Sequence, residues 1–175
     1  MEQILDSKGL TEQQAIERYR QKNYPKPALT ADVVVFRREK GEVKLLLIKR
    51  GGHPFIGKWA LPGGFANENE PVELTAAREL QEETGVSNLS MRLVGVFSRP
   101  ERDPRGWVVS AAFAAVIEED IAVLAGDDAD KAEWFTIAKQ GEAVSLKNGE
   151  TVLSPDELAF DHGEILLCAI NQCGI

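Results

Sequence analysis

The chain has 175 residues, of which 43% are hydrophobic and 27% are charged, and its formal net charge is −8. This length suits one domain with a sizeable core, and the composition is ordinary for a globular protein. The acidic balance argues against a general nucleic-acid-binding protein, because neutralising phosphates requires a basic surface. It does not argue against a small anionic substrate that is held through metal ions.

The sequence carries no sign of export or of a membrane anchor. Residues 1–10 are polar and mixed in charge, without the apolar stretch of a secretory signal. The longest nearly apolar run, Val108 to Ile117, is too short to span a bilayer. Cys168 and Cys173 lack CxxC spacing and are interpreted as reduced thiols. We therefore expect a cytoplasmic protein with no membrane partner.

Residues 1–28 are predicted to form a helical extension ahead of the main domain. Thr11 and Gln14 make a capping-box pattern that opens a short helix ending near Gln21. The sequence Asn-Tyr-Pro-Lys-Pro at 23–27 then interrupts this helix. The extension could cover the core or reach a partner subunit, and the sequence does not decide between these two roles.

The main domain, residues 29–175, begins with a predicted hairpin. Leu29–Arg37 and Val43–Lys49 are apolar, β-rich runs joined by polar residues. Both runs are nearly continuous rather than alternating, which is typical of central strands buried on two faces. Further elements are predicted in this order: strands at 89–97, 107–117 and 131–137, a hairpin turning at Asn148–Gly149, and an amphipathic helix over 161–172.

Some residues outside the regular elements have side chains that could serve a site. Asp161 is interpreted as the N-cap of the C-terminal helix and His162 as a surface residue. His53 and Phe55 lie on the loop over 50–58 and are interpreted as local packing. None of these residues is therefore assigned to a functional site.

A helix of good helix formers is predicted between two glycines, Gly64 and Gly85. Pro71 stands where a first-turn proline is tolerated, and Gly85 is placed to act as the left-handed C-cap. The turn Leu61-Pro62-Gly63-Gly64 leads into this segment. The chain is organised around this turn and helix, because they carry its strongest chemical signal.

That signal is a cluster of like charges on the predicted helix. Glu79, Glu82 and Glu83 are spaced i, i+3 and i+4, so they share one face. They crowd the C-terminal half of the helix, where its dipole disfavours anions, and Arg78 can neutralise only part of the charge by pairing with Glu82. A bound divalent cation would offset this repulsion, and carboxylate oxygens are hard ligands that suit Mg²⁺ or Mn²⁺.

A second candidate site is the connection over residues 98–106, which holds Arg99, Arg102 and Arg105. Guanidinium groups bind phosphate oxygens bidentately, so these three arginines are predicted to bind a diphosphate substrate. Glu101 and Asp103 offset part of the positive charge. A solvated hairpin tip is therefore the alternative interpretation of this loop.

The segment over 64–86 matches G-x5-E-x7-R-E-U-x-E-E-x-G-U, where U is bulky and apolar, at every specified position. It resembles the Nudix box. Stretches at 28–36, 57–64, 102–106, 125–128 and 158–162 are similar to the ADP-ribose pyrophosphatase branch of the Nudix superfamily. In that superfamily a proline shortly after the box is associated with ADP-ribose preference; Pro100 fits this loosely, and Pro104 is the alternative.

The resemblance implies an α/β fold, an α/β/α sandwich with a mixed sheet and a catalytic loop and helix. It also implies Mg²⁺, with Mn²⁺ as an alternative. The implied metal ligands are the backbone carbonyl of Gly63 and the carboxylates of Glu79, Glu82 and Glu83. Arg78 would orient the glutamates, and Glu70 would support the loop and helix.

The implied reaction is the attack of water on one phosphorus of ADP-ribose, which gives AMP and ribose 5-phosphate. Family members differ in the position of their general base. Here the base stays open between Glu79 and the acidic loop over 118–130, in which Asp127 and Asp128 are favoured. The residue that stacks on adenine also stays open, and the candidates are Phe55, Trp59, Phe97 and Tyr19.

Two other functions remain open. One is the hydrolysis of another nucleoside diphosphate derivative, such as a dinucleotide, a sugar nucleotide or a damaged nucleoside triphosphate. The other is a non-enzymatic ADP-ribose sensor, because Nudix-related transcriptional regulators share the arginine loop. Many such regulators have degraded boxes and a DNA-binding winged helix, whereas this box is intact and no basic recognition helix follows the last predicted strand. We expect a small-molecule substrate, no nucleic-acid partner and, by analogy, a homodimer.

Overall fold

A computed structural model describes residues 4–126, 129–141 and 143–175 of the chain. Asp127 and the predicted catalytic residue Asp128 lie outside the described residues. Among the residues that are described, no helix has the length and apolar character needed to cross a membrane.

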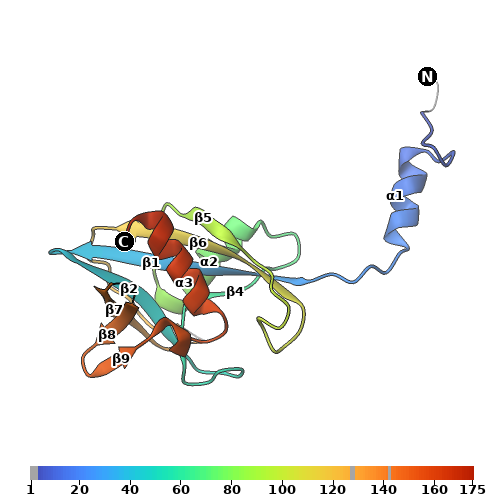
Figure 1. Cartoon of the computed structure of the whole chain (residues 1–175). Helices are drawn as coiled ribbons and strands as arrows, with labels where there is room; N and C mark the ends of the chain where they lie inside the picture. The colour runs from blue at the N-terminus through green and yellow to red at the C-terminus, as the bar shows by residue number, and fades with distance from the viewer. Residues whose placement is uncertain (1–3, 127–128, 142) are drawn as a thin grey trace.

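A mixed β-sheet forms the centre of the molecule (Figure 1). Its strands are β1 (Ala28–Glu39), β2 (Glu42–Arg50), β3 (Trp59–Ala60), β4 (Gly63–Phe65), β5 (Arg92–Phe97), β6 (Val108–Ile117), β7 (Ala129–Gln140), β8 (Ala143–Asn148) and β9 (Thr151–Leu153). The main path runs β5-β6-β1-β2-β7-β8-β9, with β3 paired to β2 and β4 paired to β1. The β1–β6 pair is parallel, whereas β1 and β2 form the predicted antiparallel hairpin.

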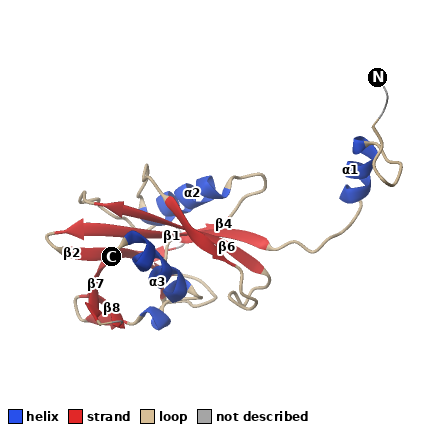
Figure 2. Ribbon diagram, turned by 45° about the horizontal axis from the view of Figure 1, so that its top comes forward, coloured by secondary structure: helices blue, strands red, loops and turns tan. Residues whose placement is uncertain are grey.

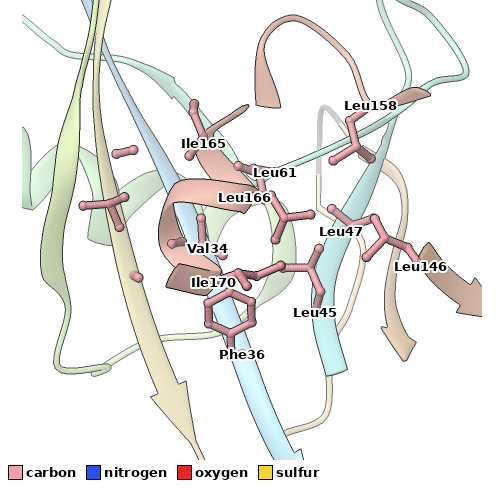
Figure 3. Packing of buried hydrophobic residues seen from close by; sticks show 14 of the residues in the cluster. Val34, Phe36, Leu45, Leu47, Leu61, Leu146, Leu158, Ile165, Leu166 and Ile170 are labelled. Carbon is pink, nitrogen blue, oxygen red and sulfur yellow. The ribbon is translucent and has the colours of Figure 1, made fainter. Parts of the chain in front are cut away.

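One helix packs on each face of the sheet, which confirms the predicted α/β/α sandwich (Figures 1 and 2). These helices are α2 (Val72–Thr84) and α3 (His162–Cys173), and a 3-10 turn, η1 (Pro155–Glu157), precedes α3. Successive side chains of a strand point to opposite faces, so Val33 and Val35 of β1 pack with α2 while Val34 and Phe36 pack with α3. Figure 3 shows the α3 side of this core.

The N-terminal extension forms the predicted helix but stands apart from the sandwich. Helix α1 (Glu12–Arg20) begins with the expected capping box, in which Thr11 accepts from the Gln14 N–H and the Gln14 side chain accepts from the Thr11 N–H. None of its residues is buried. An extended segment joins it to β1, and Figures 1 and 2 show it projecting from the body. The extension therefore does not cover the core of its own chain.

Candidate active site

The turn over residues 61–64 packs closely against β1 and α2, so a side chain at Gly63 would meet backbone and one at Gly64 would displace the Glu79 carboxylate. A Cβ on Gly63 would lie 2.2 Å from the carbonyl oxygen of Ala31. A Cβ on Gly64 would lie 2.4 Å from a carboxylate oxygen of Glu79. The Gly63 N–H donates to Oε2 of Glu83 over 2.8 Å. These contacts hold the turn directly against the helix that carries the acidic cluster.

Arg78 organises the carboxylates at the start and middle of that helix. Its Nε donates to Glu70 over 2.9 Å, and its Nη1 donates to Glu79 over 2.7 Å and to Glu82 over 2.9 Å. Its Nη2 donates to the carbonyl of Phe65 over 3.0 Å. The hydrogen bond from Arg78 is the main reason that the pKa of Glu70 falls to about 2. Arg78 thus contacts Glu70, Glu79 and Glu82, and its role in orienting metal ligands stays a prediction.

The acidic cluster divides into buried and exposed members. Glu83 is buried, and this desolvation raises the pKa of its carboxyl to about 8. Burial also raises the pKa of Glu79, whereas the Glu82 side chain is 57% exposed and is paired with Arg78. A cation beside Glu79 and Glu83 would offset the cost of burying two like charges. The donor set therefore fits a divalent metal, although within the described residues no three acidic, His or Cys side chains already converge on one point.

A buried polar network lies beneath the turn and was not expected from the sequence. The Arg102 side chain, only 3% exposed, donates from Nε to Asp161 over 2.7 Å and lies 3.6 Å from Asp32. Asp32 also accepts from the hydroxyl of Ser110. Asp161 is at the N-cap position as predicted, but its side chain makes no capping bond because it binds Arg102 instead.

The prediction that His162 is a surface residue is wrong. The ring is buried, and its Nδ1 accepts from the Leu61 N–H over 2.9 Å. Its Nε2 lies 3.5 Å from Oδ1 of Asp32. The sequence pattern of an amphipathic helix does not reveal this contact, because Leu61 lies far away along the chain.

The three predicted arginines do not gather at one place. Arg102 and Arg105 line the same cavity, and Arg105 is held by three side-chain hydrogen bonds to Asp103. Arg99 lies outside that cavity, pairs with Glu164 over 2.9 Å and lines a separate hollow. The loop thus fits both earlier interpretations, a diphosphate-binding loop and a solvated hairpin tip. Part of it is exposed, and part is buried beside the cavity.

Glu79, Glu83, Arg102 and Arg105 line one cavity of about 580 Å³, within the usual range for small-ligand sites, whereas Glu82 and Arg99 do not line it. Its charged and titratable lining comprises Asp32, Arg50, His53, Arg78, Glu79, Glu83, Arg102, Asp103, Arg105, Asp130 and His162. The loop residue His53 therefore borders the site rather than only packing locally. An anionic substrate entering this cavity would meet both guanidinium and carboxylate groups.

The aromatic residues of the cavity differ from the four that were considered. Phe65 and Phe160 line it, and the guanidinium of Arg105 lies 4.6 Å from the Phe65 ring centre and 5.4 Å from that of Phe160. Trp59 instead packs edge-on against Phe135 in the core. Phe55, Phe97 and Tyr19 do not line the cavity either; Phe55 packs edge-on against Phe160, and Tyr19 sits on the extension. No local pattern singles out Phe65 or Phe160, because Phe65 ends the short strand β4 and Phe160 lies in a turn.

Comparison with known families identifies this arrangement. The NUDIX domain profile matches residues 26–152, which is most of the chain. The chain belongs to the Nudix family.

Two curated Nudix relatives carry ADP-ribose in their names. The ADP-ribose pyrophosphatase of Methanocaldococcus jannaschii is 39% identical over 161 residues, which cover 91% of this chain and 82% of that protein. The ADPR responsive transcriptional repressor NtrR of Acinetobacter baylyi is 32% identical over 158 residues, covering 89% of this chain and 58% of the repressor. The chain therefore spans less than two thirds of the repressor's length.

Solved structures show the same Nudix fold. A MutT/nudix family protein from Enterococcus faecalis superposes with a TM-score of 0.84 at 39% identity, covering 94% of this chain and 70% of that one. The NUDIX domain of Shewanella oneidensis NrtR, in complex with ADP ribose, superposes with a TM-score of 0.74 at 27% identity, covering 94% and 99%.

Proposed function

We propose that this Nudix protein hydrolyses the pyrophosphate bond of ADP-ribose to AMP and ribose 5-phosphate. The observation that carries the proposal is the single cavity in which Glu79 and Glu83 face Arg102 and Arg105. Such a site can hold a diphosphate between guanidinium groups and a carboxylate-bound cation. The pyrophosphatase relative and the ADP-ribose complex of the Shewanella domain support this choice of substrate.

Glu79 and Glu83, with the carbonyl of Gly63, would hold Mg²⁺, and Mn²⁺ is the alternative. When bound, the metal would neutralise the charge on the phosphate oxygens and lower the pKa of the attacking water. Arg78 keeps Glu79 turned toward the cavity through the 2.7 Å hydrogen bond. Glu82 would join the metal only by leaving its present bond to Arg78, so its part is the smallest of the three.

Glu79 is the candidate general base among the described residues. It lines the cavity, where a carboxylate can accept a proton from an attacking water, and burial raises the pKa of its carboxyl. Asp128 stays a prediction for the same role. The cytoplasmic location and the homodimer likewise stay predictions.

A second candidate function is ADP-ribose sensing without hydrolysis, and the likeness to the NtrR repressor favours it. Both functions need the cavity, but only hydrolysis needs the buried carboxylates. The intact Glu79, Glu82 and Glu83 therefore support the enzyme over the sensor. A hydrolase for another nucleoside diphosphate derivative uses the same chemistry and differs only in the pocket beyond the diphosphate.

The test is a substrate panel with a matched pair of variants. Nucleoside monophosphate release is measured with Mg²⁺ for the parent, Glu83→Gln and Glu73→Gln. The product followed is AMP from ADP-ribose, NADH and diadenosine polyphosphates, and 8-oxo-dGMP from 8-oxo-dGTP. Glu73 lies on the same helix but is exposed and away from the cavity. We expect ADP-ribose to be the preferred substrate and Glu83→Gln to lose about 10²–10³-fold in kcat, because one metal ligand is worth several kcal/mol.

Each other outcome has a definite meaning. Turnover of a different compound, lost in Glu83→Gln, would keep the site and replace the substrate. Equal rates for Glu83→Gln and Glu73→Gln would contradict the assignment of the metal site. Binding of ADP-ribose without any turnover would favour the sensor.

A further inference from the structure

The backbone of the turn between β3 and β4 is bound at three consecutive residues. The Leu61 N–H donates to His162, the Pro62 carbonyl accepts from the Val33 N–H over 2.8 Å, and the Gly63 N–H donates to Glu83. The Pro62 contact belongs to the sheet, and the Gly63 contact joins the turn to α2. The Leu61 contact is the one that comes from α3, on the opposite face of the sheet.

The Leu61 contact fixes the chemical form of the His162 ring. Because Nδ1 accepts a hydrogen bond from a backbone N–H, it carries no proton. The proton of the neutral ring is therefore on Nε2, which faces Oδ1 of Asp32 at 3.5 Å. Burial favours this neutral form, since desolvation lowers the pKa of the imidazole.

Both members of this pair are themselves held in place. Asp32 accepts from Ser110 on β6, and the neighbouring Asp161 is bound by Arg102. At Gly163 a Cβ would lie 2.4 Å from the carbonyl of Pro155, so glycine lets the first turn of α3 sit against η1. The ring of His162 thus has little freedom to move away from Leu61.

We propose that His162 and Asp32 are a positioning pair that holds the turn in the register in which Gly63 and Glu83 bind the metal. The idea rests on the proposed metal site but not on the identity of the substrate. Neither residue needs to touch the reacting atoms. His162 supplies the acceptor for Leu61, and Asp32 fixes which ring nitrogen that acceptor is. Asp32 also lies against Gly63, because a Cβ there would be 2.7 Å from its Oδ1.

The first measurement needs no substrate, and its readout is taken on the parent protein. Long-range ¹H–¹⁵N spectra of the metal-free protein report the tautomer of each imidazole, and the chain has only 2 histidines. The signals that vanish in His162→Asn belong to His162. We expect the neutral tautomer protonated at Nε2. A ring protonated at Nδ1, or one freely exchanging between tautomers, would overturn the proposal.

The second measurement is the affinity of the same proteins for Mn²⁺, followed by electron paramagnetic resonance. His162→Leu removes the acceptor for Leu61 and should weaken Mn²⁺ binding by about 10–100-fold, as is usual when a residue that orients metal ligands is lost. His162→Asn places an amide oxygen near the position of Nδ1 and should recover most of the affinity. Glu164→Gln, an exposed change on the same helix, is the matched control and should bind as the parent does.

A purely structural role for His162 gives a different pattern. It would lower the midpoint of unfolding in His162→Leu without changing the Mn²⁺ affinity of the folded protein, and that result would overturn the proposal. Recovery of Mn²⁺ affinity in His162→Asn would show that the effect of His162→Leu comes from the lost hydrogen-bond acceptor for Leu61 and not from the changed side-chain volume. If ADP-ribose proves not to be the substrate, both measurements still stand, so the two failures are distinguishable.

Discussion

The guanidinium of Arg102 lines the cavity and is also enclosed by carboxylates, and these ion pairs stabilise the fold. Arg102 binds both oxygens of Asp161 and lies near Asp32. Removing one partner of a buried ion pair leaves an uncompensated charge, which usually costs about 3–5 kcal/mol. We therefore predict that Arg102→Ala lowers the free energy of unfolding by about this amount, as measured by urea denaturation.

Arg99 is the natural control for that prediction, because it belongs to the same loop and also pairs with an acid. Its side chain is 63% exposed and that of its partner Glu164 is 56% exposed. Pairs of this kind contribute less than about 1 kcal/mol. Equal losses of stability for Arg99→Ala and Arg102→Ala would contradict the structural role of Arg102.

His162 should make the stability of the protein depend on pH. Desolvation is the largest effect and lowers the pKa of His162 from the ordinary value of 6.5. The charges of Asp32 and Asp161 raise this pKa, whereas those of Arg102 and Arg50 lower it further. The unfolded chain therefore takes up the proton first, so this contribution to stability is present above pH 6.5 and is lost as the pH falls below it.

The pH dependence is tested by comparing the free energy of unfolding of the parent and of His162→Asn at two pH values. Between pH 7.5 and 5.5 the parent should lose about 1 kcal/mol more of its unfolding free energy than His162→Asn, since each pH unit corresponds to at most 1.4 kcal/mol. Urea titrations of both proteins measure it. An equal loss in the two proteins would mean that the buried ring does not titrate as described.

Which single residues could be predicted depended on how far apart their partners lie. Glu79, Glu82, Glu83 and Arg78 could be proposed from the sequence because their spacing places them within two turns of one helix. The partners of His162, Leu61 and Asp32, are brought together only by the folding of the sheet. Asp32 in particular is hidden in the sequence, since it stands inside an otherwise apolar strand.

At the scale of elements, local signals were reliable. The capping box of α1, the left-handed C-cap Gly85 and the hairpin at Asn148–Gly149 were all predicted and are all present. Each depends on backbone geometry within a few residues. Strand β5 starts at Arg92 rather than at 89, because the end of a strand is set by its partner β6 and not by its own composition.

Helix α1 provides a prediction at this scale. It buries no residue, so the sandwich should not need it. Removing residues 1–21 should leave the midpoint of thermal unfolding and the Mg²⁺-dependent rate close to those of the parent, as calorimetry and an activity assay can measure. A large loss of thermal stability would show that the extension packs against another copy of the chain. The dependence of that loss on protein concentration would identify such a partner.

At the scale of the whole molecule, the site is a product of topology. The cavity gathers β1, the turn after β3, helix α2, the arginine loop and the start of α3. The sandwich itself could be predicted because the family resemblance supplies the layers. The parallel pairing of β1 with β6, which brings Ser110 opposite Thr30 and next to Asp32, could not be read from strand composition.

The central claim is that this cavity cleaves a diphosphate at the metal site. Phosphorus-31 NMR of ADP-ribose, recorded over time with the protein and Mg²⁺, tests it most directly. We predict that, with Mg²⁺ present, the two diphosphate signals disappear together and two phosphomonoester signals grow in equal amounts. In a sample from which Mg²⁺ has been removed by chelation, the diphosphate signals should persist. Diphosphate signals that broaden on binding but persist with Mg²⁺ present would contradict the account and would make the protein an ADP-ribose sensor.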